Sequence, residues 1–201
     1  AKHLDLATAA YRRSFDLRSR QVDAGREDHR LGAVSMSTKM ADLLDSMGRS
    51  EESMEILERG RALLEGGAAG AGGPSLEAAR QASALGRRFE KVDRFEESGD
   101  LQRRALEGLD ELQASGESEL DQTIARAADS YGRSLCTQGR YPEASQQHRR
   151  AHEIFTRLAD EGCTDREAEG ARAAGGVARS LAACGKIEEA EVWAMRAYED
   201  L

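Results

Sequence analysis

The chain has 201 residues and a formal net charge of −8, which exclude a general affinity for nucleic acid or anionic membranes. Only 4% of the residues are aromatic and two are proline, so the composition favours helix over strand. No apolar stretch approaches the about 18 residues of a membrane span, and no signal-peptide segment is visible. The three isolated cysteines (Cys136, Cys163 and Cys184) predict an intracellular, reducing and cytoplasmic setting.

The predicted elements follow in chain order. A half repeat over 1–25 holds one helix (3–22), and a first complete repeat over about 30–66 holds two, at 31–47 and 50–65. A glycine-rich connection spans 65–75, where the sequence reads EGGAAGAGGPS. The three later repeats, about 75–115, 119–161 and 164–201, hold helices at 76–92 and 95–115, 119–138 and 142–160, and 165–184 and 187–200.

The repeat assignment depends on a short pattern that recurs in four copies. The copies are anchored on small residues spaced 45, 46 and 46 positions apart, namely Ser53, Ser98, Ala144 and Ala190. Each copy first carries an apolar stripe at helical spacing, as in Ala82, Leu85, Gly86 and Phe89. A break then comes near Gly48, Asp93, Gly139 or Gly185, and a second helix begins, with Pro142 in the first turn of one of them. A period of this length predicts a solenoid of helix pairs.

The apolar residue, the Leu-Gly, the aromatic residue and the later small-x-x-x-bulky-x-x-Ala series resemble the tetratricopeptide repeat over nearly the whole chain. The repeats here are about 12 residues longer than the usual 34 or so, and in this they look most like the long repeats of kinesin light chain. The resemblance implies an all-α, right-handed α-solenoid of antiparallel helix pairs. Because neither end shows a polar capping helix, we expect a segment of a longer protein, with room for self-association through uncapped ends.

Few residues suggest chemistry. His148 and His152 stand four apart on a helix, but no third metal ligand accompanies them and two arginines lie between them, so we expect solvated histidines and no metal. Cys136 has only Arg133 as a basic neighbour, which disfavours a reactive thiol. The glycine clusters lack the Lys-Ser/Thr of a phosphate loop. The sequence thus predicts no catalytic residues, no cofactor and no enzyme activity.

A different signal lies on the first helices of three repeats. Six arginines recur at 46-residue intervals opposite the apolar stripe: Arg80, Arg87, Arg126, Arg133, Arg172 and Arg179. In tetratricopeptide arrays this face lines the concave groove. The first complete repeat has Ser35 and Asp42 instead, and Asp129 is placed to pair with Arg126 and Arg133 on its own helix. With 25 arginines and four lysines in the chain, compositional bias is the competing explanation.

The favoured interpretation is a non-catalytic interaction module whose arginine-lined groove binds an acidic or extended peptide of a partner protein. One alternative is a structural subunit of a stable assembly that uses its ends and convex face. Another is a sensor module of a larger signalling protein.

Overall fold

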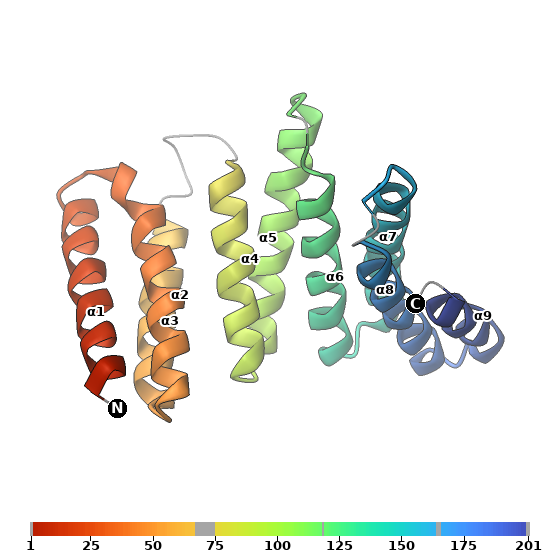
Figure 1. Cartoon of the computed structure of the whole chain (residues 1–201), viewed down its shortest axis with the longest axis horizontal. Helices are drawn as coiled ribbons and strands as arrows, with labels where there is room; N and C mark the ends of the chain where they lie inside the picture. Colours follow the sequence, from red (N-terminus) through yellow and green to blue (C-terminus); the bar gives the residue numbers. More distant parts are fainter. Residues whose placement is uncertain (1, 67–74, 118, 164–165, 200–201) are drawn as a thin grey trace. The chain divides into compact units, whose positions relative to one another are not determined.

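The computed structural model describes residues 2–66, 75–117, 119–163 and 166–199 (Figure 1). Within these ranges it contains nine α-helices and no strand, which confirms the all-α prediction. The helices are α1 (Lys2–Asp23), α2 (Arg30–Ser46), α3 (Ser50–Gly66), α4 (Leu76–Lys91), α5 (Phe95–Ala114), α6 (Asp121–Thr137), α7 (Tyr141–Asp160), α8 (Glu167–Ala183) and α9 (Ile187–Glu199). Each predicted boundary lies within two residues of the observed one where both are described. A short 3₁₀ helix, η1 (Glu27–His29), was not expected.

The same tight turn joins the two helices of each pair. Gly48, Gly139 and Gly185 have φ of 72°, 73° and 76°, and Asp93 has φ of 60° in the fourth turn. In every case the next residue donates its N–H to the carbonyl five positions earlier, as Arg140 does to Leu135 at 2.9 Å. This left-handed residue with its 6→1 bond ends a helix and reverses the chain. The predicted breaks are confirmed, as is Pro142 in the first turn of α7.

The chain divides into two compact units, each described by itself: unit 1 (Ala1–Arg94) with α1 to α4, and unit 2 (Phe95–Leu201) with α5 to α9. In each unit, helices that follow one another in the chain pack together. The first helices of adjacent pairs also contact each other directly, α2 with α4 in unit 1 and α6 with α8 in unit 2. We call these four the inner helices.

The predicted stripes form the core. All four stripe residues of α4 are buried, and so are their counterparts on α6 and α8. The small anchor residues of the second helices are buried as well, so neighbouring helices can approach closely at these points. The largest wholly buried apolar side chains in the two units include Phe15, Met40, Leu44, Leu57, Leu85, Phe89, Leu101, Leu109, Ile124, Leu135 and Phe155.

Ion pairs link the second helices of successive pairs. Arg12 on α1 meets Glu52 on α3 at 2.8 Å, and Arg149 on α7 meets Glu189 on α9 at 3.4 Å. Arg150 on α7 holds Asp110 on α5 through both of its terminal nitrogens. Part of the arginine-rich composition therefore serves contacts between repeats.

Residues 67–74 of the predicted glycine-rich connection lie outside the described residues. Just after them, the Ser75 side chain accepts a hydrogen bond from the N–H of Ala78 at 3.1 Å and caps α4. Across the described part of the chain, no helix is both long enough and apolar enough to cross a membrane. The right-handed sense, the 46-residue period and the division into a half repeat and four repeats stay predictions from the sequence.

Candidate functional site on helices α6 and α8

The predicted arginines lie on three inner helices. Arg80 and Arg87 are on α4 in unit 1, while Arg126 and Arg133 on α6 and Arg172 and Arg179 on α8 belong to unit 2. Five of the six are exposed and Arg133 is half-buried. We call the four of unit 2 the α6–α8 arginines. The position of Arg133 differs from the expectation that its side chain points fully away from the core.

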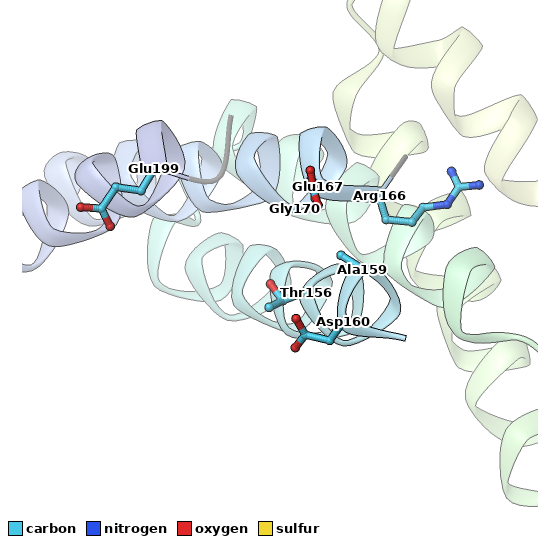
Figure 2. A pocket seen from close by; sticks show the side chains of 7 residues that line it. All are labelled: Thr156, Ala159, Asp160, Arg166, Glu167, Gly170 and Glu199. Atoms are coloured by element: carbon cyan, nitrogen blue, oxygen red, sulfur yellow. The ribbon is translucent and has the colours of Figure 1, made fainter. Parts of the chain in front are cut away.

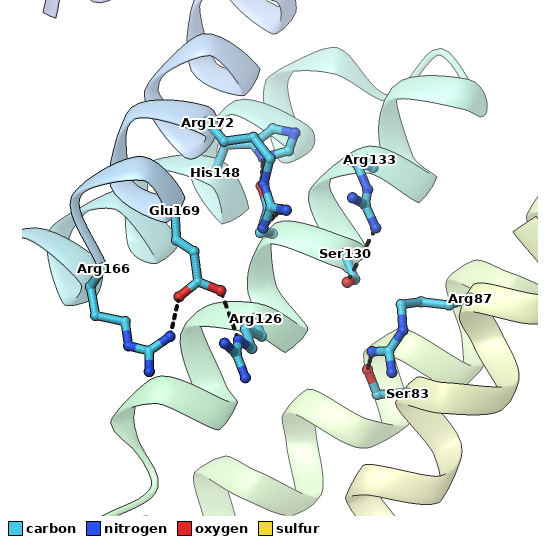
Figure 3. Close-up of polar contacts among 10 residues, drawn as sticks. Ser83, Arg87, Arg126, Ser130, Arg133, His148, Arg166, Glu169 and Arg172 are labelled. Carbon is cyan, nitrogen blue, oxygen red and sulfur yellow. Dashed lines mark hydrogen bonds and ion pairs between the residues drawn. The ribbon is translucent and has the colours of Figure 1, made fainter. Parts of the chain in front are cut away.

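Arg126 is held by a carboxylate from the neighbouring inner helix. Its Nε donates to Glu169 Oε1 at 2.8 Å, and Nη1 of Arg166 donates to Glu169 Oε2 at the same distance (Figure 3). The Gln122 amide, oriented with its oxygen toward the two guanidinium groups, accepts from Arg166 Nη1 at 2.8 Å and Arg126 Nη2 at 3.0 Å. Burial alone would raise the pKa of Glu169, but hydrogen bonds from Arg126 and Arg166 hold that pKa below its ordinary value.

Arg172 is held in a similar way by Asp129. Its Nη2 lies 3.0 Å from Asp129 Oδ2, while the Nδ1–H of His148 donates to Asp129 Oδ1, also at 3.0 Å. The Asp129 side chain is only 3% exposed, whereas that of Arg172 is 51% exposed. The expected pairing of Asp129 along its own helix is wrong for Arg126, which binds Glu169 instead. The charge of Arg133 does act on Asp129 and helps to lower the pKa of its carboxyl, while the carboxylate itself contacts His148 of α7 and Arg172 of α8.

The expectation of solvated histidines is also wrong. His148 is 1% exposed and His152 is 6% exposed, because α7 turns this face toward α6 and α8. His152 donates its Nδ1–H to the Gly170 carbonyl at 3.2 Å and stands edge-on to the Trp193 ring at 5.2 Å. Guanidinium groups of Arg149 and Arg196 lie 4.9 and 4.6 Å from the same ring. Trp193 is buried among α8 and α9 residues.

Two glycines make the space for the His148 ring. A Cβ atom on Gly132 of α6 would lie 2.9 Å from the ring, and one on Gly176 of α8 would lie 2.6 Å from it. Real Cβ atoms do not approach that closely, so the imidazole is clamped between two helix backbones. Burial alone would lower the pKa of His148, but the contacts with Asp129 and Cys136 outweigh burial and raise the pKa above its ordinary value.

Cys136 completes this group from the last turn of α6. Its Sγ lies 4.0 Å from His148 Nε2 and 3.2 Å from the Ser180 Oγ of α8. The thiol therefore has partners that its sequence neighbours did not reveal. The three cysteines are free thiols, with Cys136 half-buried and the other two exposed.

None of the α6–α8 arginines lines either of the two clefts described in unit 2. One of about 390 Å³ opens between α7, α8 and α9, and its charged lining is mostly carboxylate (Figure 2). Asp160, Glu167 and Glu199 line it, with Arg166 at one side. Such a lining repels an acidic ligand. Among the described residues, no group of three histidine, cysteine or acidic side chains is arranged to hold a metal ion.

The sequence did contain one signal for the buried group that we did not use. Asp129 stands directly beside the stripe residue Ala128, and an acid in that position lies at the edge of the core face. Its partner stands 19 residues away on another helix, so no local pattern identifies it. Glu169 and Gln122 were missed for the same reason.

Comparisons with known proteins identify the fold. No protein-family model matches the chain, and no curated protein matches it. Solved structures do match. Putative kinesin light chain TPR-like repeats from Podosopora anserina superpose with a TM-score of 0.63 at 14% identity, over 96% of this chain and 95% of that one. BtubC (BKLC) from P. vanneervenii gives a TM-score of 0.54 at 15% identity, over 98% of this chain and 90% of that one.

The apo form of RapI gives a TM-score of 0.58 at 17% identity, over 99% of this chain and 49% of that protein. At these identities the likeness concerns the fold. The chain has the tetratricopeptide-type helical-repeat fold that the sequence predicted.

Proposed function

From this fold we propose that the chain is a non-catalytic protein-interaction module, and that the face of α6 and α8 binds a carboxylate-rich, extended peptide of a partner. The observation that carries the proposal is that Arg126 and Arg172 are both held in place and exposed. Each is fixed by a carboxylate from the neighbouring inner helix, and each keeps 51% of its side chain exposed. A guanidinium that is both held and accessible is suited to binding a carboxylate with two hydrogen bonds.

Fixed arginines lose less entropy on binding than free ones. An arginine side chain carries about 2 kcal/mol of rotamer entropy, part of which Arg126 and Arg172 have already given up. Arg172 uses Nη2 for Asp129, and Arg126 uses Nε for Glu169. Each guanidinium has further N–H donors in its planar fork to offer a ligand. Preorganisation of this kind raises affinity without additional contact area.

The charge balance of this face favours an acidic ligand although the whole chain carries −8. Asp129 is buried and its charge is shared between His148 and Arg172, so little of it reaches the surface. Glu169 lies between Arg126 and Arg166, which leaves one positive charge in that trio uncompensated. Arg133 and Arg179 lie on the same two helices. A local positive surface on an acidic protein steers acidic partners to one place.

The packing of unit 2 supports a groove on this side. Helices α6 and α8 contact each other directly, whereas α7 packs on both α6 and α8, and α9 packs on α8. A layer of closely spaced helices lies on the concave side of a curved stack. Arg80 and Arg87 present a similar pair on α4 within unit 1, where Arg87 Nη1 donates to Ser83 Oγ at 3.0 Å (Figure 3). We propose the same role for them, tested separately.

A second candidate function is a structural subunit of an assembly. Helix α9 exposes four large apolar residues, Ile187, Val192, Met195 and Tyr198. Neighbouring exposed apolar side chains favour contact with another protein surface. If charge reversal of the α6–α8 arginines abolishes binding of a partner protein, the first function is supported. If substitution of the four apolar α9 residues by polar ones abolishes it, the second function is supported. For either function we propose a cytoplasmic setting, in keeping with the three free thiols.

The test is a binding titration with a fluorescein-labelled oligoglutamate peptide, read by fluorescence anisotropy at low and at physiological ionic strength. Arg179→Glu should weaken binding about tenfold or more, because a charge-assisted hydrogen bond is lost and a repulsion added. Arg126→Lys should weaken it less, since the charge stays and the fork is lost. Affinity should fall with added salt.

The control is Arg103→Glu, which reverses an exposed arginine on α5 that pairs within its own helix with Asp100 and Glu107. It should change the affinity by less than about twofold, because surface pairs of this kind contribute little. Equal weakening by the α5 and α8 variants would contradict a defined site. A matching loss of thermal stability in Arg179→Glu would instead mark this arginine as a support between helices.

A further inference from the structure

Cys136 stands where three helices of unit 2 meet. It lies in the last turn of α6, half-buried, with the His148 imidazole of α7 on one side and the Ser180 hydroxyl of α8 on the other. The other two cysteines, Cys163 and Cys184, are exposed. None of the contacts described for those two includes a histidine. The same protein therefore contains one cysteine in a polar cluster and two that serve as controls.

The geometry directs the histidine at the sulfur. Asp129 fixes the Nδ1 side of the His148 ring at 3.0 Å, and the backbones of Gly132 and Gly176 close both faces of the ring. The remaining nitrogen, Nε2, faces Cys136 Sγ at 4.0 Å. A carboxylate behind a histidine stabilises the imidazolium form, which in turn stabilises a thiolate in front of it. The arrangement is a carboxylate, an imidazole and a thiol in series.

Ser180 provides the second polar contact, and its hydroxyl has two possible partners. In the present geometry it donates to the Gly176 carbonyl at 2.8 Å, while its oxygen lies 3.2 Å from Cys136 Sγ and can accept from the thiol. A hydroxyl hydrogen rotates freely about the C–O bond. When the sulfur is a thiolate, the hydroxyl can turn and donate to it instead. The site can thus accommodate both protonation states without moving a heavy atom.

We propose that Cys136 is an oxidative modification site, a nucleophilic cysteine that reacts with hydrogen peroxide or a small organic hydroperoxide. The inference rests on the group of Cys136, His148, Asp129 and Ser180, and it is independent of peptide binding. Cys136 is only half-buried, so a small peroxide can reach the sulfur. The exposed Arg179 of α8 adds positive charge near the sulfur, which favours its anionic form further.

The reaction balances with groups that are present and a peroxide from outside. The thiolate sulfur attacks one peroxide oxygen, so an S–O bond forms while the O–O bond breaks. The sulfur is oxidised to a sulfenic acid, and the peroxide is reduced to water or, for an organic hydroperoxide, to the alcohol. The leaving oxygen takes the Nε2 proton of the His148 imidazolium. A reducing thiol of low molecular weight would restore the cysteine through a mixed disulfide.

The electrostatics agree with this geometry. Burial alone would raise the pKa of the Cys136 thiol, but hydrogen bonds from His148 and Ser180 and the charges of His148 and Arg179 lower the pKa below its ordinary value. Each unit by which a thiol pKa falls toward neutrality raises the thiolate fraction at pH 7 about tenfold and lowers the nucleophilicity about threefold, a net gain of about threefold. We therefore expect a moderately higher rate of reaction with peroxide at Cys136 than at the other two cysteines.

The experiment exposes the folded chain to limiting hydrogen peroxide, traps sulfenic acid with dimedone, and measures labelling of the three cysteines by mass spectrometry. Cys136 should be labelled faster than Cys163 and Cys184, by about threefold for each unit by which its pKa is lowered. In Asp129→Asn and Ser180→Ala, both close in size to the original residues, this advantage should shrink while labelling of Cys163 stays constant. His148→Gln should abolish it.

A second measurement needs no variant of the cluster. The pH profile of alkylation of the wild-type chain by iodoacetamide should rise at lower pH for Cys136 than for the two exposed cysteines, and the ultraviolet absorbance of thiolate lost in Cys136→Ser should titrate over the same range. If Cys136 is labelled no faster than the controls and its profile coincides with theirs, the proposal is overturned. Insensitivity of its rate to Asp129→Asn and His148→Gln would overturn it equally.

Discussion

Helices α2 and α4 of unit 1 contact each other as α6 and α8 of unit 2 do. The two pairs differ in where their acidic side chains lie. In unit 1 the carboxylate of Asp42 is 44% exposed and binds Arg88 at the surface. In unit 2 the carboxylate of Asp129 is 3% exposed and is shared by His148 and Arg172. In unit 1 the acid pairs with an arginine at the surface, whereas in unit 2 the acid is buried and Arg172 stays exposed.

The difference shows that the fold does not require the arginines. Ser35 and Asp42 stand on α2 at the sequence positions that correspond to Arg126 and Arg133 of α6, and the helices still pack. The charge of the inner face is therefore free to vary within one fold. This freedom supports the proposal that the arginines held in place in unit 2 bind a ligand.

The largest expected effect concerns the two adjacent glycines of α8. Gly176→Ala should destabilise unit 2 by about 1–3 kcal/mol, because a Cβ would lie 2.6 Å from His148 Nδ1 and the clamped ring has nowhere to move. Gly175→Ala is the matched control, since a Cβ there meets nothing within 4 Å and helix propensity should stabilise by up to about 1 kcal/mol. Urea unfolding measures both. Equal effects of the two alanines would show that the histidine is not clamped.

The second-largest expected effect is a pH dependence of stability that differs between the two units. The pKa of His148 is raised in the folded state, so its stabilisation is complete below the unfolded pKa near 6.5 and is lost as pH rises through the folded pKa. The pKa of Asp129 is lowered, so its contribution is present above its unfolded value and lost in acid. Unit 2 should therefore lose stability as the pH rises above about 6.5 and through the folded pKa of His148, by about 1.4 kcal/mol for each unit by which that pKa is raised. The groups that face His148 are Asp129, Cys136 and, through Asp129, Arg172 and Arg133.

Thermal unfolding in buffers from about pH 5 to pH 9 measures this dependence, with His148→Gln as the control that should flatten it. Unit 1 has no wholly buried histidine among its described residues, so its transition should move less over this range. If the unfolding temperature of unit 2 does not change with pH, the Asp129–His148 contact has no ionic character.

The smallest expected effect tests whether inner-face charge is neutral to the fold. Asp42→Arg replaces a half-exposed carboxylate on α2 and breaks its pair with Arg88, which should cost no more than about 1 kcal/mol. The same variant should raise affinity for the oligoglutamate peptide, because α2 then carries an arginine as α6 does. A stability loss of several kcal/mol would mean that the comparison between the units fails and that charge on this face is a folding requirement.

The helices and the core could be predicted because their signals are local. Stripes such as Ala82, Leu85, Gly86 and Phe89 identify a buried face from a single segment, and turn glycines mark where each helix ends. The exposure of five arginines followed from their angle on the helix in the same way. Their partners did not, because Glu169 and Asp129 reach them across 43 positions from another helix.

The burial of His148 was unpredictable for a related reason. Its side chain is long, polar and usually solvated, and only two glycines on other helices make the space that it fills. A repeat signature is set by the residues that every copy shares. Asp129, Cys136 and His148 have no identical residue at the corresponding positions of the other copies, so the signature that reveals the fold says nothing about them.

The position of Trp193 has a consequence for observing the molecule. It is the only tryptophan in the chain, and it lies in unit 2 edge-on to His152 with guanidinium groups above its ring. Its fluorescence therefore responds when α7, α8 and α9 separate and is silent about unit 1. Circular dichroism, by contrast, sums the helices of both units. Followed together through one denaturation, the two signals give the melting of each half of an unlabelled protein.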